Sequence, residues 1–276
     1  MLLDRLNLKM DHFYSSGLFL TTEEQLILQT SLPILQQENK FLSLTFLGKI
    51  FGTVNDYYIV QGRGEDFIRS KMTFYSVDGY SWRLLFLPSV DSLKCFHLVR
   101  TRFKGDPICK HKYHGGPEVE EGNKKAEIKE EDRLSAFVKL MDYETAIGPK
   151  NSLMITPKGI INQNPYFQGI SKFDALKLES YLHYRLPDSD IGFVPTTLIC
   201  PPGGDRPLQF MEPISKDYPP GTWTLQADSL EEVVTIRNLW WPGYRFYFIP
   251  ETGEYNSLYM GYGERNDDLP FMILDK

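Results

Sequence analysis

Cysteine and histidine side chains, which can bind zinc or serve in nucleophilic catalysis, gather in one stretch of the sequence. These residues are Cys95, His97, Cys109, His111 and His114. Zinc accepts both ligand types, but the spacing matches no known zinc finger, and Lys110 and Lys112 would repel a cation. A Cys–His nucleophile pair can also be drawn, yet nothing locates an orienting Asn or an oxyanion donor. We therefore favour a buried thiol beside surface histidines, with a Cys/His-dependent hydrolase or a zinc-binding protein as the alternative.

Carboxylates are concentrated between residues 118 and 133, a segment with seven acidic and four basic residues. General acid–base catalysis needs a pocket that shifts carboxylate pKa values, whereas a run of charges is usually solvated. We therefore predict that the carboxylates of 118–132 lie in water, in a loop or at the exposed start of a helix. Leu134, Phe137, Val138 and Met141 then follow with helical spacing, although a strand is an open alternative.

Glycine pairs at 62 and 64 and at 261 and 263 resemble the start of a phosphate-binding loop. Neither pair extends to GxGxxG or to a loop ending in Gly-Lys-Ser/Thr, and the chain has no GxSxG nucleophile motif. We interpret these glycines as turn residues. The sequence thus predicts a protein that is not an enzyme, with no catalytic residue, no cofactor and no bound metal.

Aromatic residues are the strongest remaining signal, and they gather near the C-terminus. The last 55 residues hold 11 aromatics, including three of the four tryptophans. Adjacent residues of a strand face opposite ways, so one of Trp240 and Trp241 can be core while the other reaches a partner. Tyrosine and tryptophan are enriched at protein contacts, which favours an interaction module over an enzyme. The predicted partner interface contains Trp240, Trp241, Tyr244, Tyr247, Tyr259 and Tyr262.

The composition is that of an ordinary folded chain. Of 276 residues, 42% are hydrophobic and 24% charged, and the net charge is −6, which argues against a nucleic-acid binder. Three cysteines are too few for a secreted disulfide framework. No apolar run approaches the roughly 18 residues of a spanning helix, and no signal-peptide core follows the start. We expect a soluble intracellular protein that binds neither nucleic acid nor membrane.

Two helices are predicted, near 22–38 and 171–184. Thr22 and Gln25 have the spacing of a capping box, and Pro33 should kink or end the first helix near Leu32. Ser171 and Asp174 have the spacing that begins the second helix.

Most other segments have the pattern of strands. Alternation predicts strands over 42–61, with a bulge or turn at Gly48, and over 98–103. Asp78-Gly79 predicts a hairpin between 72–75 and 80–85, and 222–262 predicts an antiparallel meander. The expected fold class is α+β, β-rich, with antiparallel sheets and a few helices.

The predicted domain organisation depends on the segment 187–221. Residues 187–221 contain eight prolines and four glycines, a density that excludes regular elements. We expect an N-terminal α+β lobe over 1–186, an ordered loop or linker over 187–221, and an aromatic-rich β-meander over 222–276 that packs on the first lobe. One continuous domain is the alternative.

Several strings, in order and at matching spacing, make the chain resemble the radial spoke head protein 9 family of motile cilia and flagella. The strings are FLGKI at 46–50, DYYIVQG at 56–62, YS at 75–76, Trp82, RFKGDP at 102–107, KEE at 129–131, RL at 133–134, NP at 164–165, FQGIS at 167–171, YLHYR at 181–185, LWWPG at 239–243, GYGERN at 261–266 and DLPFM at 268–272. They extend from about residue 22 to the end. Departures fall in 108–123 and 187–221, and neither Cys95 nor Cys109 belongs to the pattern.

The resemblance implies a non-catalytic structural subunit of the radial spoke head, which scaffolds head assembly and contacts the central-pair apparatus to regulate ciliary beating. The implied partners are radial spoke head proteins of the 4/6 type, MORN-repeat spoke head subunits, spoke stalk proteins and, transiently, the central pair. The implied location is the axoneme of the cilium or flagellum, with the cytoplasm before assembly.

Overall fold

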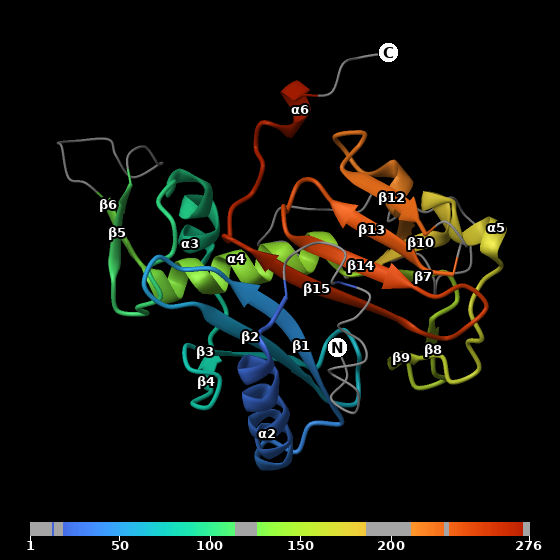
Figure 1. Ribbon diagram of the computed structural model, residues 1–276, viewed down its shortest axis with the longest axis horizontal. Helices are drawn as coiled ribbons and strands as arrows, with labels where there is room; N and C mark the ends of the chain where they lie inside the picture. Colours follow the sequence, from blue (N-terminus) through green and yellow to red (C-terminus); the bar gives the residue numbers. More distant parts are fainter. Residues whose placement is uncertain (1–12, 14–18, 114–125, 186–210, 229–231, 273–276) are drawn as a thin grey trace.

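An eight-stranded sheet built from both ends of the chain forms the centre of the molecule (Figure 1). The computed structural model describes residues 13, 19–113, 126–185, 211–228 and 232–272. Along the sheet the strands are β12 (Trp223–Ala227), β13 (Val234–Asn238), β14 (Tyr244–Phe248), β15 (Tyr255–Gly261), β1 (Ser43–Ile50), β2 (Tyr57–Arg63), β3 (Lys71–Ser76) and β4 (Arg83–Leu85). All neighbours pair antiparallel except β1 and β15, which pair parallel. The predicted α+β, β-rich class and the C-terminal meander are confirmed.

Alternation along the central strands gives the sheet two buried faces. In β2, Tyr57 and Ile59 face one hydrophobic cluster, while Tyr58 and Val60 face another. Helix α2 (Thr22–Glu38) covers the second face through residues that include Leu28. Helix α4 (Glu130–Thr145) covers the first face, so the sheet lies between two helical layers.

The helix predicted over 22–38 is confirmed, but its predicted N-cap is wrong. The N-cap is Thr21, whose Oγ1 accepts from the Glu24 N–H at 3.2 Å while Glu24 accepts from the Thr21 N–H at 2.8 Å. At Pro33 the sequence predicts a kink or an end near Leu32, and the end is wrong because the helix continues to Glu38. Burial of Leu32 and Leu35 against the sheet offsets the hydrogen bond that proline removes.

The Asp78-Gly79 hairpin and the bulge at Gly48 are both confirmed. Asp78 Oδ1 accepts from the N–H groups of Tyr80 and Ser81, at 2.9 and 2.8 Å. Gly79 has φ 77°, the left-handed backbone that glycine adopts without strain. The β1–β2 register shifts between Phe46 and Gly48, beside the parallel pairing with β15.

The helix predicted over 171–184 is wrong beyond its first turn. Ser171 caps α5 (Lys172–Ala175), which is followed by a 3-10 turn, η4 (Leu178–Ser180), and then by strand β10 (Tyr181–Tyr184). Tyr181 and His183 are both buried from the same strand face, an arrangement that period-two spacing satisfies. Tertiary burial thus overrides helical spacing.

The strand predicted over 98–103 is also absent. Helix α3 (Val90–Cys95) and η3 (Phe96–Leu98) precede irregular backbone there, in which Val99 and Phe103 are buried without a pairing strand. The helix predicted around Leu134 is confirmed as α4.

Small sheets and short turns complete the described structure. They are β5 (Lys110–Tyr113) with β6 (Ala126–Lys129), β8 (Leu153–Ile155) with β9 (Ile161–Gln163), β7 (Ile147–Pro149) and β11 (Met211–Pro213) on either side of β10, η7 (Ile214–Lys216) and α6 (Leu269–Met272). Among the described helices none combines the length and the apolar character needed to cross a bilayer.

The strand pairing bears on the expected lobes. Because β15 pairs with β1, the C-terminal meander continues the sheet of the N-terminal segment. Most of the proline-rich segment, residues 187–210, lies outside the described residues. Its described end holds β11 and η7 beside β10, so the prediction that 187–221 contains no regular element is wrong there, because β11 pairs with β10. We propose on this basis that 1–186 and 222–276 form one continuous domain.

Candidate interaction site

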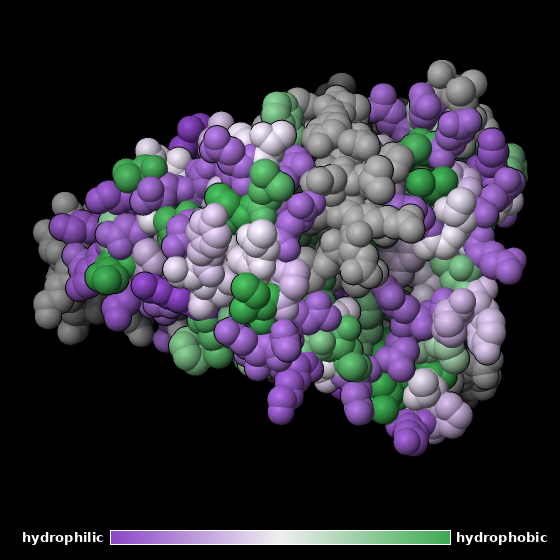
Figure 2. Space-filling view, turned by 60° about the horizontal axis from the view of Figure 1, so that its bottom comes forward, coloured by the Kyte–Doolittle hydropathy of each residue, from purple (hydrophilic) through white to green (hydrophobic). Residues whose placement is uncertain are grey.

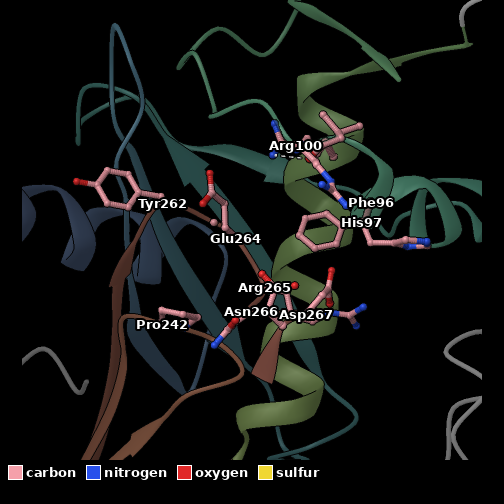
Figure 3. Close-up of a pocket in the computed structure, with 13 residues that line it drawn as sticks. Phe96, His97, Arg100, Pro242, Tyr262, Glu264, Arg265, Asn266 and Asp267 are labelled. Atoms are coloured by element: carbon pink, nitrogen blue, oxygen red, sulfur yellow. Dashed lines mark hydrogen bonds and ion pairs between the residues drawn. The ribbon is translucent and has the colours of Figure 1, made fainter. Parts of the chain in front are cut away.

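A pocket of about 450 Å³ opens beside the Trp240-Trp241-Pro242-Gly243 corner (Figure 3). One wall is the α3–η3 segment and the residues after it, which contribute Phe96, His97 and Arg100. The other wall is the chain after β15, from Tyr262 to Asp268. The pocket therefore joins segments about 160 residues apart in the sequence, and the two C-terminal strings LWWPG and GYGERN meet in it.

Trp241 anchors this corner to the core. Its ring is fully buried, with centroids 6.0 Å from Phe96 and 5.4 Å from Phe137. Its Nε1–H donates to Glu144 Oε2 at 2.5 Å, and its backbone N–H donates to Asn238 Oδ1 at 2.7 Å. Burial raises the pKa of Glu144. The corner is thus held rigidly by packing and by hydrogen bonds from both sides.

The chain after β15 is tied back along the corner. The Asn266 N–H donates to the Trp240 carbonyl at 2.9 Å, and Gly263 N–H donates to Tyr259 Oη at 2.9 Å. Gly243 has φ 107°, and a Cβ there would lie 2.2 Å from the Met260 carbonyl oxygen. Glycine is therefore required for this close backbone approach.

Cations stacked on aromatic rings form the outer rim. The Arg265 guanidinium lies 5.2 Å from the Trp240 ring centroid, and its Nε pairs with Asp267 at 2.6 Å. The Arg102 guanidinium lies 4.1 Å from the ring of Tyr262, which is 46% exposed. Aromatic rings and arginines that are partly buried and partly exposed to solvent are typical of protein contact surfaces.

A second polar cluster is closed rather than open, and it centres on Glu130 at the start of α4. Glu130 Oε1 accepts from Tyr57 Oη at 2.8 Å and from the backbone of Gly105 at 2.7 Å and Asp106 at 3.1 Å. Oε2 accepts from the Lys104 N–H at 2.8 Å and from His111 Nε2 at 2.5 Å. Burial alone would raise the pKa of Glu130, but these hydrogen bonds lower it below its usual value.

This burial corrects the prediction that the carboxylates of 118–132 are solvated. Glu130 is fully buried because the 102–107 loop and β5 fold over the helix start, and their donors replace water. The helix dipole adds to this, since its positive end favours a carboxylate in the first turn. Asp132 is exposed as predicted, while residues 118–125 lie outside the described residues.

Comparison with known proteins places the chain in a family. Residues 2–146 match the family model described as Radial spokehead-like protein. The chain is 37% identical to the radial spoke head protein 9 homolog of Bos taurus, over 94% of this chain and 95% of the relative. It is 36% identical to the Homo sapiens homolog and 32% identical to the Danio rerio homolog, each over 98% of this chain and 99% of the relative. The chain belongs to the radial spoke head protein 9 family. The family is a structural component of the radial spoke, as the resemblance of the sequence predicted.

Within this member of the radial spoke head protein 9 family, the six predicted interface aromatics divide into two groups. Four are buried and serve the core: Trp241, Tyr244, Tyr247 and Tyr259. Tyr244 Oη donates to the Thr145 carbonyl at 2.6 Å, which joins β14 to the end of α4. Trp240 is half-buried and Tyr262 is exposed, so these two rings are the ones available to a partner.

The cysteine and histidine residues also divide. Cys109, His111 and Glu130 bring ligand-type atoms within 4.8 Å of one another. Both nitrogens of His111 are already bonded, Nε2 to Glu130 and Nδ1 to Thr101 Oγ1 at 3.0 Å. The trio therefore ties β5 to α4 by hydrogen bonds, and the residues present do not favour zinc.

The other members of that prediction lie elsewhere. Cys95 is buried in α3 and His97 is exposed at the pocket rim. Neither belongs to the Cys109 cluster in the described structure, and His114 lies outside the described residues.

Sequence reasoning missed Arg133, which lines the buried end of the pocket. It ends the charged run 118–133, a pattern that is typical of solvated side chains. Its helical position is the available signal: Arg133 directly precedes Leu134 and is one turn before Phe137, so it shares the inward side of α4.

Proposed function

We propose that this chain is a structural subunit of the radial spoke head in the axoneme of motile cilia or flagella. There it scaffolds head assembly and contributes to the contact with the central-pair apparatus that regulates beating. The observation that carries this proposal is similarity along almost the whole chain to relatives that are named for the spoke head.

The described polar clusters support a structural role rather than a catalytic one. Glu130 is fully buried and accepts hydrogen bonds on both oxygens, so it holds segments together instead of facing a cleft. The pair of buried His183 and partly buried Asp217 is similar: Asp217 Oδ2 accepts from His183 Nε2 at 2.7 Å and from Trp223 Nε1 at 2.6 Å. A buried charge fixed by several donors is suited to stability, because catalysis needs access to a substrate.

The partners we propose are other radial spoke components. Among these, spoke head proteins of the 4/6 type, MORN-repeat subunits and stalk proteins would form lasting contacts, and the central pair would touch the head transiently. Assembly would begin in the cytoplasm. A chain of net charge −6 is poorly suited to nucleic acid, and we propose no membrane contact.

The surface we propose for a partner is the pocket and its rim at Trp240 and Tyr262. Figure 2 shows, on the face nearer α2, hydrophobic residues in small groups separated by hydrophilic ones. That face offers no broad apolar area for an obligate interface among its described residues, which favours the structured corner instead.

Purification from ciliated cells tests the role. A tagged chain is expressed in ciliated cells, axonemes are extracted with salt, and the purified complex is analysed by quantitative mass spectrometry. Recovery of other spoke head subunits in near-equal amounts is the expected result. Recovery of the chain alone, as a monomer outside the axoneme, would contradict the proposal.

A matched pair of variants assigns the surface in the same experiment. Tyr262→Ala should reduce the recovery of one spoke subunit, whereas Tyr80→Ala, which removes another exposed tyrosine ring from the β3–β4 hairpin, should not. Equal recovery with both variants would move the interface away from the corner.

A further inference from the structure

The Arg133 side chain leaves hydrogen-bonding capacity unused at the buried end of the pocket. It is 1% exposed and lines the pocket, and one face of its guanidinium lies 4.2 Å from the Phe103 ring centroid. Nη2 donates to the Val99 carbonyl at a long 3.4 Å. Nε and Nη1 meet no acceptor among the residues that the structure describes, and almost no surface of either atom is open to solvent, so a ligand reaches them only if the inner end of the pocket opens. Buried donors without acceptors are rare in folded proteins and point to a partner group.

Nearby carboxylates of the chain do not fill this need. Both oxygens of Glu130 are taken by Tyr57, His111 and backbone donors. Asp267 is bonded to Arg265. Glu264 lies near enough to favour the charged form of Arg133, yet neither Nε nor Nη1 is bonded to it. In Figure 3, Arg100 and Glu264 come from the two different walls of the pocket.

We propose that this pocket opens locally toward Arg133 and binds the carboxylate side chain of an aspartate or glutamate in a peptide segment of a partner spoke protein. A carboxylate suits a guanidinium because it offers two oxygens to planar donors. A volume of about 450 Å³ admits a side chain with its neighbours, and Arg100 adds a second positive charge at the mouth. The inference rests on the proposed role in the spoke head, since it names the chemistry of the partner.

Acidic groups at the mouth set a limit on the ligand. Glu264, Asp267 and Asp268 line the outer part of the pocket. These acidic groups would repel a peptide with several consecutive carboxylates. A peptide with one acidic residue between neutral or basic residues would be repelled much less. The pocket therefore discriminates an isolated acidic residue from an acidic tail.

Peptide binding tests this inference. Purified full-length chain is screened against overlapping 15-residue peptides tiled over the spoke subunits that copurify with it, and the affinities of binders are measured by fluorescence anisotropy. Binding peptides should share one acidic residue. Changing that residue to its amide, or making Arg133→Met in the chain, should each weaken binding about 30-fold or more.

Controls separate a binding role from a structural one. Arg133→Met keeps an unbranched stem and removes the unsatisfied donors, so the melting temperature should not fall. Arg83→Met, which removes an exposed arginine in β4, should leave peptide affinity unchanged. If Arg133→Met fails to fold, Arg100→Glu replaces it as the test variant. Reversal of this exposed charge should slow association of the acidic peptide and leave that of the amide peptide unchanged.

Two results would overturn the inference. One is equal affinity for the acidic and amide peptides, which would show that the carboxylate is not recognised. The other is unchanged binding with both Arg133→Met and Arg100→Glu. Either result, with copurification of spoke subunits intact, removes the pocket assignment while leaving the role in the spoke head standing.

Discussion

Glu130 carries a negative charge in the interior of the chain, and at the scale of single residues it holds three segments together. It receives hydrogen bonds from the 102–107 loop, from β2 through Tyr57 and from β5 through His111. None of these contacts is local, so the sequence around Glu130 could not reveal them. The same holds for Arg133, whose burial depends on Phe103 and on the chain after β15.

Replacing Glu130 with glutamine should destabilise the protein at neutral pH. The amide cannot accept all of these bonds, and donors left unsatisfied should lower the free energy of unfolding by about 2–4 kcal/mol. The folded-state pKa lies below the usual 4.5, so the charge stabilises above pH 4.5 and this contribution is lost as pH falls toward the folded value. Denaturant unfolding at several pH values should therefore show that the free energy of unfolding falls less steeply with acidification in Glu130→Gln than in the unchanged chain. Asp132→Asn, at an exposed position in the same turn, is the control.

The two adjacent tryptophans should behave differently when each is changed to alanine. Trp241→Ala empties a fully buried site and should lower the free energy of unfolding by about 3–5 kcal/mol. Trp240→Ala removes a half-buried ring and should leave the fold intact while weakening recovery of spoke partners. Chemical denaturation and quantitative copurification measure the two effects. A large stability loss with Trp240→Ala would assign that ring to the core instead.

At the scale of elements, local patterns predicted what local forces determine. Helix α2, the Asp78-Gly79 hairpin and the C-terminal meander follow from spacing, capping and turn residues. The helix prediction for 171–184 is wrong because pairing of β10 with β7 and β11 fixes the backbone of that segment as a strand. The parallel pairing of β1 with β15 joins strands about 200 residues apart, which no local signal specifies.

The β1–β15 junction should depend on Gly48. A Cβ at this position would lie 2.0 Å from the Tyr259 carbonyl oxygen, so the two strands would have to separate. Gly48→Ala should therefore lower the free energy of unfolding by about 1–3 kcal/mol and raise hydrogen exchange in β15. Gly159→Ala is the control, because a Cβ there would meet nothing within 4 Å. It measures the cost of placing alanine at a positive φ without any clash. Unchanged exchange in β15 would show that the junction does not need the glycine.

At the scale of the whole molecule, the sheet shared by both ends of the chain presents one structured corner, with a pocket and an aromatic rim, to its surroundings. The sequence strings identified the family, and the comparisons confirmed it. The position of the surface could not follow from the strings, because LWWPG, GYGERN and the segment after α3 meet only in the folded chain.

Electron cryotomography of axonemes tests the central claim, a structural role in the spoke head, most directly. Averaged radial spokes are compared between ciliated cells that lack this chain and the same cells expressing it again. The account predicts that head density is missing or incomplete without the chain and returns when the chain is restored. Complete spoke heads in axonemes that lack the chain would contradict it.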